Sequence, residues 1–247
     1  MPVWIFLRGL TREGRHWGGF TDQFQRTFPD CQIVALDLPG NGRFNMHSSP
    51  CHVKDLMAHC RIQMASLGIP PPFNLLAMSL GAMVSVAWSA AYPHEVSRSV
   101  LINTSLRPFS PFYHRLRPDS YAALLRLVLI GGTAEEWEST VLHLTSNRHD
   151  HQVLPDWMAI RRRNPVSTLN ALRQLVAAAR YSAPAIRPRA ATLILASEQD
   201  RLVSVDCSKA LAQSWDCALR VHPDAGHDLP LDEGLWVASQ VKQWMAG

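Results

Sequence analysis

Hydrophobic residues along this chain fall into two alternating patterns. Short runs that are almost entirely apolar occur at residues 3–7, 33–38, 73–78, 100–103, 192–196 and 218–221. Each run ends in, or is followed within two residues by, a Gly, Pro, Asn or Ser. A strand that is covered on both faces lacks the polar alternation of an exposed one, so these runs predict buried strands of a parallel sheet.

The stretches between these runs carry apolar residues at every third or fourth position. One such stripe starts at Val53 and ends before Gly68, and another occupies the final stretch around Val237 and Val241. This spacing predicts amphipathic helices. Strands that alternate with helices predict an α/β fold, with right-handed crossovers, about six mostly parallel strands, and helices on both faces of the sheet.

One interval is too long for a simple crossover. More than eighty residues separate the strand that ends near Thr104 from the strand that begins near Ala191, whereas a crossover needs only about a dozen. Helical stripes at 121–130, 134–144 and 166–180 fill the interval. We therefore expect a helical cap at residues 107–186, inserted into a core of residues 1–106 and 187–247. Its expected place is the carboxyl edge of the sheet, where open α/β sheets bind ligands.

Composition and charge exclude several classes of function. The 247 residues include 24 Lys and Arg against 20 Asp and Glu, a net charge of +4. That excess does not indicate nucleic-acid binding, which needs clustered cations, and the one dense run, Arg161 to Arg163, is expected to be a solvated helix end. No stretch approaches the ~20 apolar residues of a membrane span. The five cysteines are irregularly spaced, and the amino terminus has no features of a signal peptide. Both observations are typical of a cytoplasmic protein with reduced thiols.

The sharpest local signal lies around Ser79. The apolar run 73–78 leads directly into this serine, and a helical pattern begins at once after it. A serine at such a junction sits on a tight turn with its hydroxyl above the sheet edge, and small residues two positions before and after it, here Ala77 and Gly81, keep strand and helix from colliding. On its own a Ser-x-Gly is weak evidence, because serine is also a common helix cap.

Two further residues in the last third of the chain strengthen the signal. Asp200 follows the run 192–196, and His227 follows the run 218–221. A serine hydroxyl is hardly ionised at neutral pH and needs a base, which His227 can be, while a carboxylate such as Asp200 can hold the imidazole tautomer. The order Ser, Asp, His, each just after a parallel strand, predicts a catalytic triad. By contrast, His149, Asp150 and His151 lack a further ligand, so no metal site is expected there.

These motifs resemble the α/β-hydrolase superfamily, in particular its small, capped, esterase-like members. The resemblance covers nearly the whole chain, including the turn after the second strand and the segments around Ser79, Asp200 and His227. It implies acyl transfer to water through an acyl-enzyme, without a cofactor. It also implies an oxyanion hole formed by the backbone N–H groups of Leu10 and Leu80, each donor of which is worth ~10²–10³ in rate.

The chain departs from the family pattern at Arg8. Family members usually carry His-Gly where this chain has Arg8-Gly9. Arg8 could pair with a carboxylate, since a buried charge needs a partner, or it could bind an acidic group of the substrate. The sheet also begins where relatives have their third strand, so their amino-terminal hairpin is expected to be missing.

The resulting hypothesis is a serine hydrolase that cleaves a carboxylic ester of a small or medium acyl substrate. One alternative is an esterase or thioesterase acting on chains held by an acyl carrier protein, similar to the pimeloyl-carrier methyl ester esterases, because arginines of the expected cap such as Arg115, Arg117 and Arg126 could receive an acidic carrier. A second alternative is a non-catalytic ligand receptor on the same fold, against which the complete triad argues.

Overall fold

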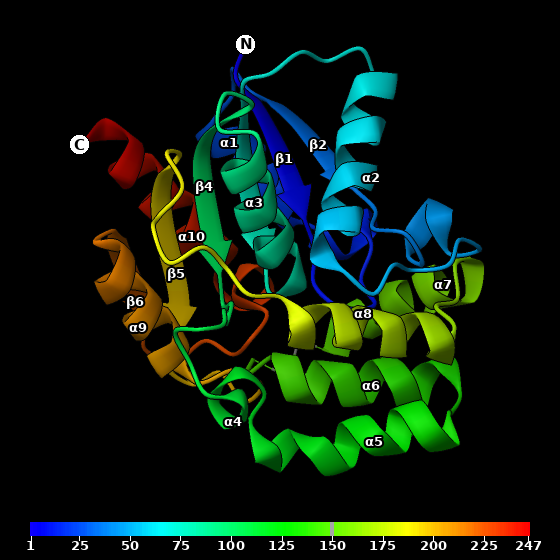
Figure 1. Cartoon of the computed structure of the whole chain (residues 1–247). Coiled ribbons are helices and arrows are strands. Elements are labelled where there is room, and N and C mark those ends of the chain that lie inside the picture. Colours follow the sequence, from blue (N-terminus) through cyan, green and yellow to red (C-terminus); the bar gives the residue numbers. More distant parts are fainter. Residues whose placement is uncertain (149–150) are drawn as a thin grey trace.

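Six parallel strands form one sheet within the described part of the chain (Figure 1). The structure is a computed structural model and describes residues 1–148 and 151–247. The strand order across the sheet is β2-β1-β3-β4-β5-β6. The strands are β1 Val3–Leu7, β2 Gln32–Leu36, β3 Phe73–Met78, β4 Val96–Ile102, β5 Ala191–Ser197 and β6 Ala218–His222. All six predicted strands are present, and the predicted fold class is confirmed.

The largest difference from the sequence prediction lies in β4. This strand begins at Val96, four residues before the predicted start. Its first half carries Ser97, Arg98 and Ser99, which interrupt the apolar run. Ser99 is nevertheless buried, because its hydroxyl lies 3.1 Å from that of Ser85 and 3.0 Å from that of Ser89. A hydrogen-bonded serine can therefore occupy a buried strand position that its polarity argues against.

Helices cover both faces of the sheet. The first face carries α2 Val53–Ser66, α3 Leu80–Ala91 and α9 Val205–Trp215, and the second carries α1 Phe20–Thr27 and α10 Leu229–Ala246. Side chains of β1 alternate between the two cores, with Ile5 and Leu7 in the first and Trp4 and Phe6 in the second. Because consecutive strand residues point to opposite faces, a strand covered on both sides is apolar at most of its positions.

The chain between β4 and β5 is helical, as the sequence predicts. Its helices are α4 Phe112–Arg115, α5 Tyr121–Ile130, α6 Ala134–Thr145, α7 Leu154–Arg163 and α8 Thr168–Arg180. Figure 1 shows α5, α6 and α8 beyond the carboxyl ends of the strands. Of α7 the sequence predicted only the arginine run at its end, because the helix buries only Trp157 and Ile160 and lacks a clear apolar stripe. The cap boundaries at 107 and 186 stay a prediction.

The expectation of a solvated arginine cluster is partly wrong. Arg161, Arg162 and Arg163 do form the last turn of α7, and the last two are exposed. Arg161 is not, because its side chain is only 16% exposed and lies 3.6 Å from the carboxylate of Glu138 on α6. The partner stands on another helix, so no local pattern predicts this contact.

Short 3₁₀ helices complete the described elements: η1 Gly14–Trp17, η2 Gly42–Phe44, η3 Pro118–Ser120 and η4 His151–Val153. Among the helices of the described residues, none has the length and apolar character needed to cross a membrane.

Candidate active site

Ser79 occupies a strained turn between β3 and α3. Its φ of 53° and ψ of −118° lie in a region that non-glycine residues rarely adopt. Two hydrogen bonds hold the turn: the Ser79 amide donates to the carbonyl of Ile102 at 2.9 Å, and the hydroxyl of Thr104 donates to the Ser79 carbonyl at 3.1 Å. Strain of this kind persists where the surroundings enforce it, and it is common at active sites.

The turn requires glycine at position 81. A Cβ atom there would lie 2.4 Å from the carbonyl oxygen of Leu7 and 2.6 Å from that of Arg8. The first turn of α3 thus passes directly against the end of β1. Ala77, at the other small position, is completely buried. These contacts explain why a helix that starts beneath Ser79 carries a small residue two positions later.

The loop after β1 passes beside Ser79. A Cβ at Gly9 would lie 3.2 Å from the Cβ of Ser79. Among the described residues, no group accepts a hydrogen bond from the backbone amide of Leu10 or of Leu80. Two amides without acceptors, one in the loop beside Ser79 and one in the residue directly after it, are the kind of donors that can stabilise an oxyanion.

Buried side chains hold this loop in place. Thr11, with a φ of 58°, donates its amide to Gln174 Oε1 of α8 at 2.9 Å. Gln174 Nε2 donates in turn to Asn41 Oδ1 at 2.7 Å, and Asn41 Nδ2 donates to the carbonyl of Arg12 at 2.9 Å. Gln174 and Asn41 have no exposed surface. Helix α8 therefore contributes directly to the conformation of the loop that carries Leu10.

Asp200 and His227 form a buried pair. His227 Nδ1 lies 2.7 Å from Asp200 Oδ2, and the two residues are 5% and 2% exposed. The other carboxylate oxygen of Asp200 accepts the amides of Leu202 at 2.8 Å and Val203 at 2.9 Å. The carboxylate is fixed by its own turn and faces the imidazole, the arrangement that orients a catalytic histidine.

Asn103, at the end of β4, supports the histidine loop. Its side-chain amide donates to the carbonyls of His227 at 2.8 Å and Gly226 at 3.2 Å, and its Oδ1 accepts the amide of Ser197 at 2.9 Å. Asn103 has a φ of 43°, which turns its side chain across the strand ends. Asn103 is not among the site residues predicted from the sequence, although an asparagine directly after a buried strand is a signal for such a turn.

The three predicted triad residues follow the carboxyl ends of three strands of the sheet, of which β5 and β6 are neighbours and β3 is separated from β5 by β4. Ser79 follows β3, Asp200 follows β5, and His227 follows β6. The structure joins Asp200 to His227, but no hydrogen bond among the described residues links the Ser79 hydroxyl to His227. Hydrogen bonds of this kind are often long or misaligned before substrate binds.

Arg8 makes a buried ion pair with Asp228. Its Nη1 and Nη2 atoms lie 3.0 and 2.5 Å from the two carboxylate oxygens, and the side chains are 2% and 3% exposed. The Arg8 guanidinium also lies 4.8 Å from the ring centre of Trp17. Burial alone would raise the pKa of Asp228, but the charge and hydrogen bonds of Arg8, assisted by Arg12, outweigh it and lower this pKa. Asp228, next to His227, was missed by the sequence analysis.

A second buried ion pair joins the same loop to the helical segment. Arg12 Nη1 lies 2.5 Å from Glu138 Oε2 of α6, and its guanidinium stacks 4.1 Å from the ring centre of Trp157. The neighbouring His16 is buried, and burial together with the charge of Arg12 holds its pKa well below the usual value. Through these contacts, α6 and α7 pack against the loop after β1.

No group of three or more His, Cys, Asp or Glu side chains suited to a metal ion occurs in the described residues. Two of the residues weighed for such a site in the sequence, His149 and Asp150, lie outside the described residues.

The chain belongs to the alpha/beta hydrolase family, whose model matches residues 4–240. It is also 31% identical over 122 residues to pyrrolizixenacetamide deacetylase of Xenorhabdus hominickii. That match covers 46% of this chain and 45% of the relative, so it spans less than half of either protein.

Three solved structures illustrate the likeness in fold. A hydrolase from Pseudomonas aeruginosa PA01 has a TM-score of 0.80 at 17% identity, covering 100% of this chain and 90% of its own. A thermophilic esterase from Thermogutta terrifontis has a TM-score of 0.77 at 18% identity, with coverage of 100% and 90%. The 2-hydroxy-6-oxo-6-phenylhexa-2,4-dienoate hydrolase of Rhodococcus sp. strain RHA1 has a TM-score of 0.76 at 17% identity, with coverage of 100% and 91%. The resemblance to the α/β-hydrolase superfamily stated above is thereby confirmed.

Proposed function

We propose that this protein is a serine hydrolase that cleaves a carboxylic ester of a small or medium acyl substrate. The observation that carries the proposal is the buried pair of His227 and Asp200 at the same sheet edge as the strained turn of Ser79. A carboxylate, an imidazole and a hydroxyl in this order are the groups that a covalent acyl-transfer mechanism needs.

The reaction proceeds in two halves. Because Nδ1 of His227 faces Asp200, Nε2 is the nitrogen that takes the proton of Ser79 as the hydroxyl attacks the ester carbonyl. The amides of Leu10 and Leu80 stabilise the negative charge on the carbonyl oxygen. The protonated imidazole then gives its proton to the departing alcohol, and the C–O bond breaks to leave an acyl-serine. A water molecule, deprotonated by His227, releases the acid and restores Ser79.

In this proposal Arg8 has a structural role. Its two terminal nitrogens face Asp228 and its side chain is almost fully buried, which leaves little access for an acidic substrate group. The pair ties the end of β1, from which the Leu10 loop starts, to the residue after His227. Arg8 would thus replace the usual loop histidine by linking the two halves of the site.

Cleavage of an N-acetyl amide is a second candidate, favoured by the similarity to a deacetylase over 122 residues. The same groups can perform it, with His227 protonating an amine instead of an alcohol. Turnover on an acetamide and on an ester of the same acid separates the two possibilities.

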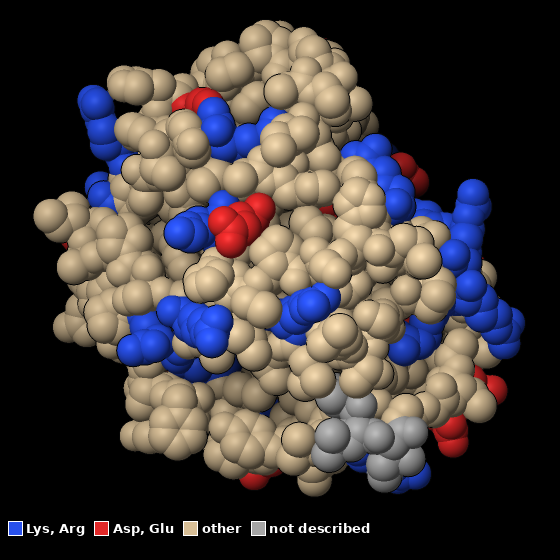
Figure 2. Space-filling view, turned by 45° about the vertical axis from the view of Figure 1, so that its right-hand side comes forward, with Lys and Arg blue, Asp and Glu red and all other residues tan. Residues whose placement is uncertain are grey.

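The structure offers less support for docking of an acyl carrier. On the face shown in Figure 2, Lys and Arg side chains lie in several separate groups. Arg115, one of the arginines considered for docking, donates to the carbonyl of Ala178 at 2.7 Å, and Arg161 of the same helical segment lies near Glu138. A carrier-dependent esterase remains testable through the salt sensitivity of its turnover.

The proposal is tested with purified protein, p-nitrophenyl esters of two to eight carbons and a fluorophosphonate probe. We expect ester turnover and covalent labelling, both lost in Ser79→Ala by a factor above about 10⁴. The matched control is Ser66→Ala, which removes an exposed hydroxyl at the end of α2 and should keep both signals. Turnover that survives in Ser79→Ala would contradict the assignment. Absence of both labelling and turnover in the unaltered protein would favour the ligand-receptor alternative.

A further inference from the structure

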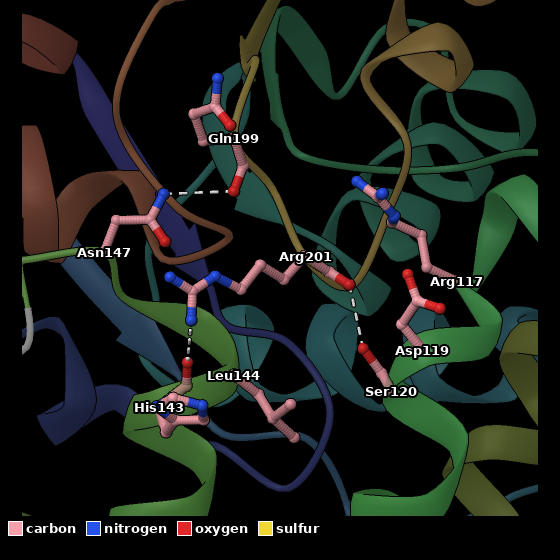
Figure 3. Close-up of a pocket in the computed structure, with 8 residues that line it drawn as sticks. All are labelled: Arg117, Asp119, Ser120, His143, Leu144, Asn147, Gln199 and Arg201. Carbon is pink, nitrogen blue, oxygen red and sulfur yellow. Dashed lines mark hydrogen bonds between the residues drawn. The ribbon is translucent and has the colours of Figure 1, made fainter.

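A cleft of about 560 Å³ opens where the helical segment meets the turn that carries Asp200 (Figure 3). Three stretches form its walls: η3 with the preceding Arg117, the end of α6 and the residues after it with His143 and Asn147, and the turn after β5 with Gln199 and Arg201. None of the triad or oxyanion residues lines it. Its volume lies within the range of about 300–1,000 Å³ that is usual for small-molecule sites.

Hydrogen bonds fix the walls of this cleft. Arg117 donates its amide to the carbonyl of Leu202 at 2.8 Å and its Nη1 to the carbonyl of Asp200 at 3.0 Å. The intervening carbonyl of Arg201 accepts the hydroxyl of Ser120 at 2.9 Å. Four consecutive residues are bound in this way, since Asn147 Nδ2 donates to the carbonyl of Gln199 at 3.1 Å. The cleft is therefore preformed and does not depend on the folding of a loose surface loop.

The two arginines of the cleft have main-chain partners but no carboxylate partner in the part of the chain that the structure describes. Arg117 donates to the carbonyl of Asp200, and Arg201 Nη1 donates to the carbonyl of His143 at 3.3 Å. Among the described residues, neither forms an ion pair, even though Asp119 belongs to the same lining. A guanidinium group carries five N–H donors, so each retains several for a ligand. In Figure 3 the Arg201 side chain extends between Asn147 and His143.

We propose that this cleft binds a small organic anion through a carboxylate or phosphate group. Arg117 and Arg201 supply the positive charge and planar donor sets that match such oxyanions. Ser120, Asn147 and Gln199 add neutral polar groups, and Leu144 offers an apolar contact for the carbon part of the ligand. None of the residues proposed for catalysis lines the cleft, but its lining residues Gln199 and Arg201 flank Asp200, whose carboxylate is directed to His227.

Isothermal titration calorimetry at low ionic strength tests this proposal with inorganic phosphate and with glutarate as probes. We expect one site for at least one probe, and a Kd at least tenfold weaker in Arg201→Gln. The matched control is Arg162→Gln, which removes another exposed arginine, at the end of α7, and should leave the Kd unchanged. No measurable binding of either probe, or equal affinity in Arg201→Gln and the unaltered protein, overturns the proposal.

A second variant guards against effects of misfolding. Asp119→Asn removes the acidic group of the lining, so we expect anion binding to tighten severalfold, a gain that a damaged protein does not show. Unchanged or weaker binding in Asp119→Asn counts against the proposed site. These binding measurements do not depend on hydrolysis, so they stand even if the proposed function fails.

Kinetic measurements show whether the anionic group belongs to the substrate or to a separate molecule. This experiment rests on the proposed function. The KM of p-nitrophenyl hydrogen glutarate is compared with that of p-nitrophenyl butyrate. If the cleft receives the acidic end of the substrate, Arg201→Gln raises only the KM of the acidic ester. If it receives a separate molecule, the ratio of the two KM values stays unchanged while Arg201→Gln still weakens binding of the glutarate probe. Both outcomes support an anion site and identify its ligand as substrate or as separate molecule.

Discussion

Replacing Arg8 with methionine should destabilise the protein far more than the same replacement of an exposed arginine. The substitution leaves the Asp228 carboxylate buried without the two hydrogen bonds at 3.0 and 2.5 Å that now neutralise it. Removal of one partner of such a pair costs about 3–5 kcal/mol, because an uncompensated charge remains in the interior. The double variant Arg8→Met, Asp228→Leu removes both charges, so it should recover most of this loss.

The pH dependence of the loss has a definite sign. An aspartate in an unfolded chain has a pKa of about 3.9. In the folded protein Arg8 lowers the pKa of Asp228, so this carboxylate contributes stability above about pH 4 that is lost as the pH falls through the lowered pKa. In Arg8→Met the burial of Asp228 is no longer offset by Arg8, so the pKa of Asp228 is expected to rise. The variant is then most stable relative to the unfolded chain below about pH 4 and loses stability as the pH rises towards the raised pKa.

Urea unfolding followed by tryptophan fluorescence measures this difference between pH 4.5 and 7. The free energy of unfolding of Arg8→Met should fall further below that of the unaltered protein as the pH rises. The control Arg162→Met, at an exposed position, should stay within about 0.5 kcal/mol. A loss under about 1 kcal/mol for Arg8→Met that is the same at every pH would refute the reasoning.

Three further predictions concern other parts of the site and the core. Gly81→Ala should yield little folded protein on expression, because its Cβ would meet the Leu7 carbonyl at 2.4 Å, whereas Gly19→Ala has free space and should show a nearly unchanged melting temperature. Cys60 is completely buried and burial raises its pKa to about 12, so Ellman's reagent at pH 8 should modify it only after denaturant is added; rapid labelling in the native protein would contradict its burial. Gln174→Leu should lower kcat on a butyrate ester by about tenfold, less than the ~10²–10³ of a missing oxyanion donor. Gln174→Glu keeps the hydrogen-bond acceptor for the loop after β1 and should lower kcat less. Equal kcat values in the two variants would show that this hydrogen bond does not position the loop for catalysis.

Much of the fold could be predicted because its signals are local. The bounds of β1 and β3 agree with the runs 3–7 and 73–78, since a strand covered on both faces is almost entirely apolar. The turn around Ser79 was likewise recognisable, because a strand, a serine and small flanking residues occur within a few positions. The α5 bounds, Tyr121–Ile130, agree with a predicted stripe for the same reason.

Contacts between distant segments were harder to predict. Arg8 was expected to need a partner if it had a structural role, but Asp228 lies 220 residues away and nothing in either neighbourhood indicates the match. The burial of Arg161 depends on Glu138 of another helix. The support of the Leu10 loop by Gln174 involves helix α8, whose stripe pattern predicts a helix but not which side chain reaches the loop.

The amino-acid sequence by itself determined the class of fold, the number of strands and the candidate residues Ser79, Asp200 and His227. Each of these follows from periodicity and turn chemistry within about ten residues, where backbone geometry alone decides which side chains share a face. Tertiary structure alone decided that Asp228 neutralises Arg8 and that the turn of Asp200 borders a cleft with two arginines that lack a carboxylate partner in the described chain. Such contacts depend on how separate elements are placed in space, because the charge of a side chain states that it needs a partner but not where that partner lies.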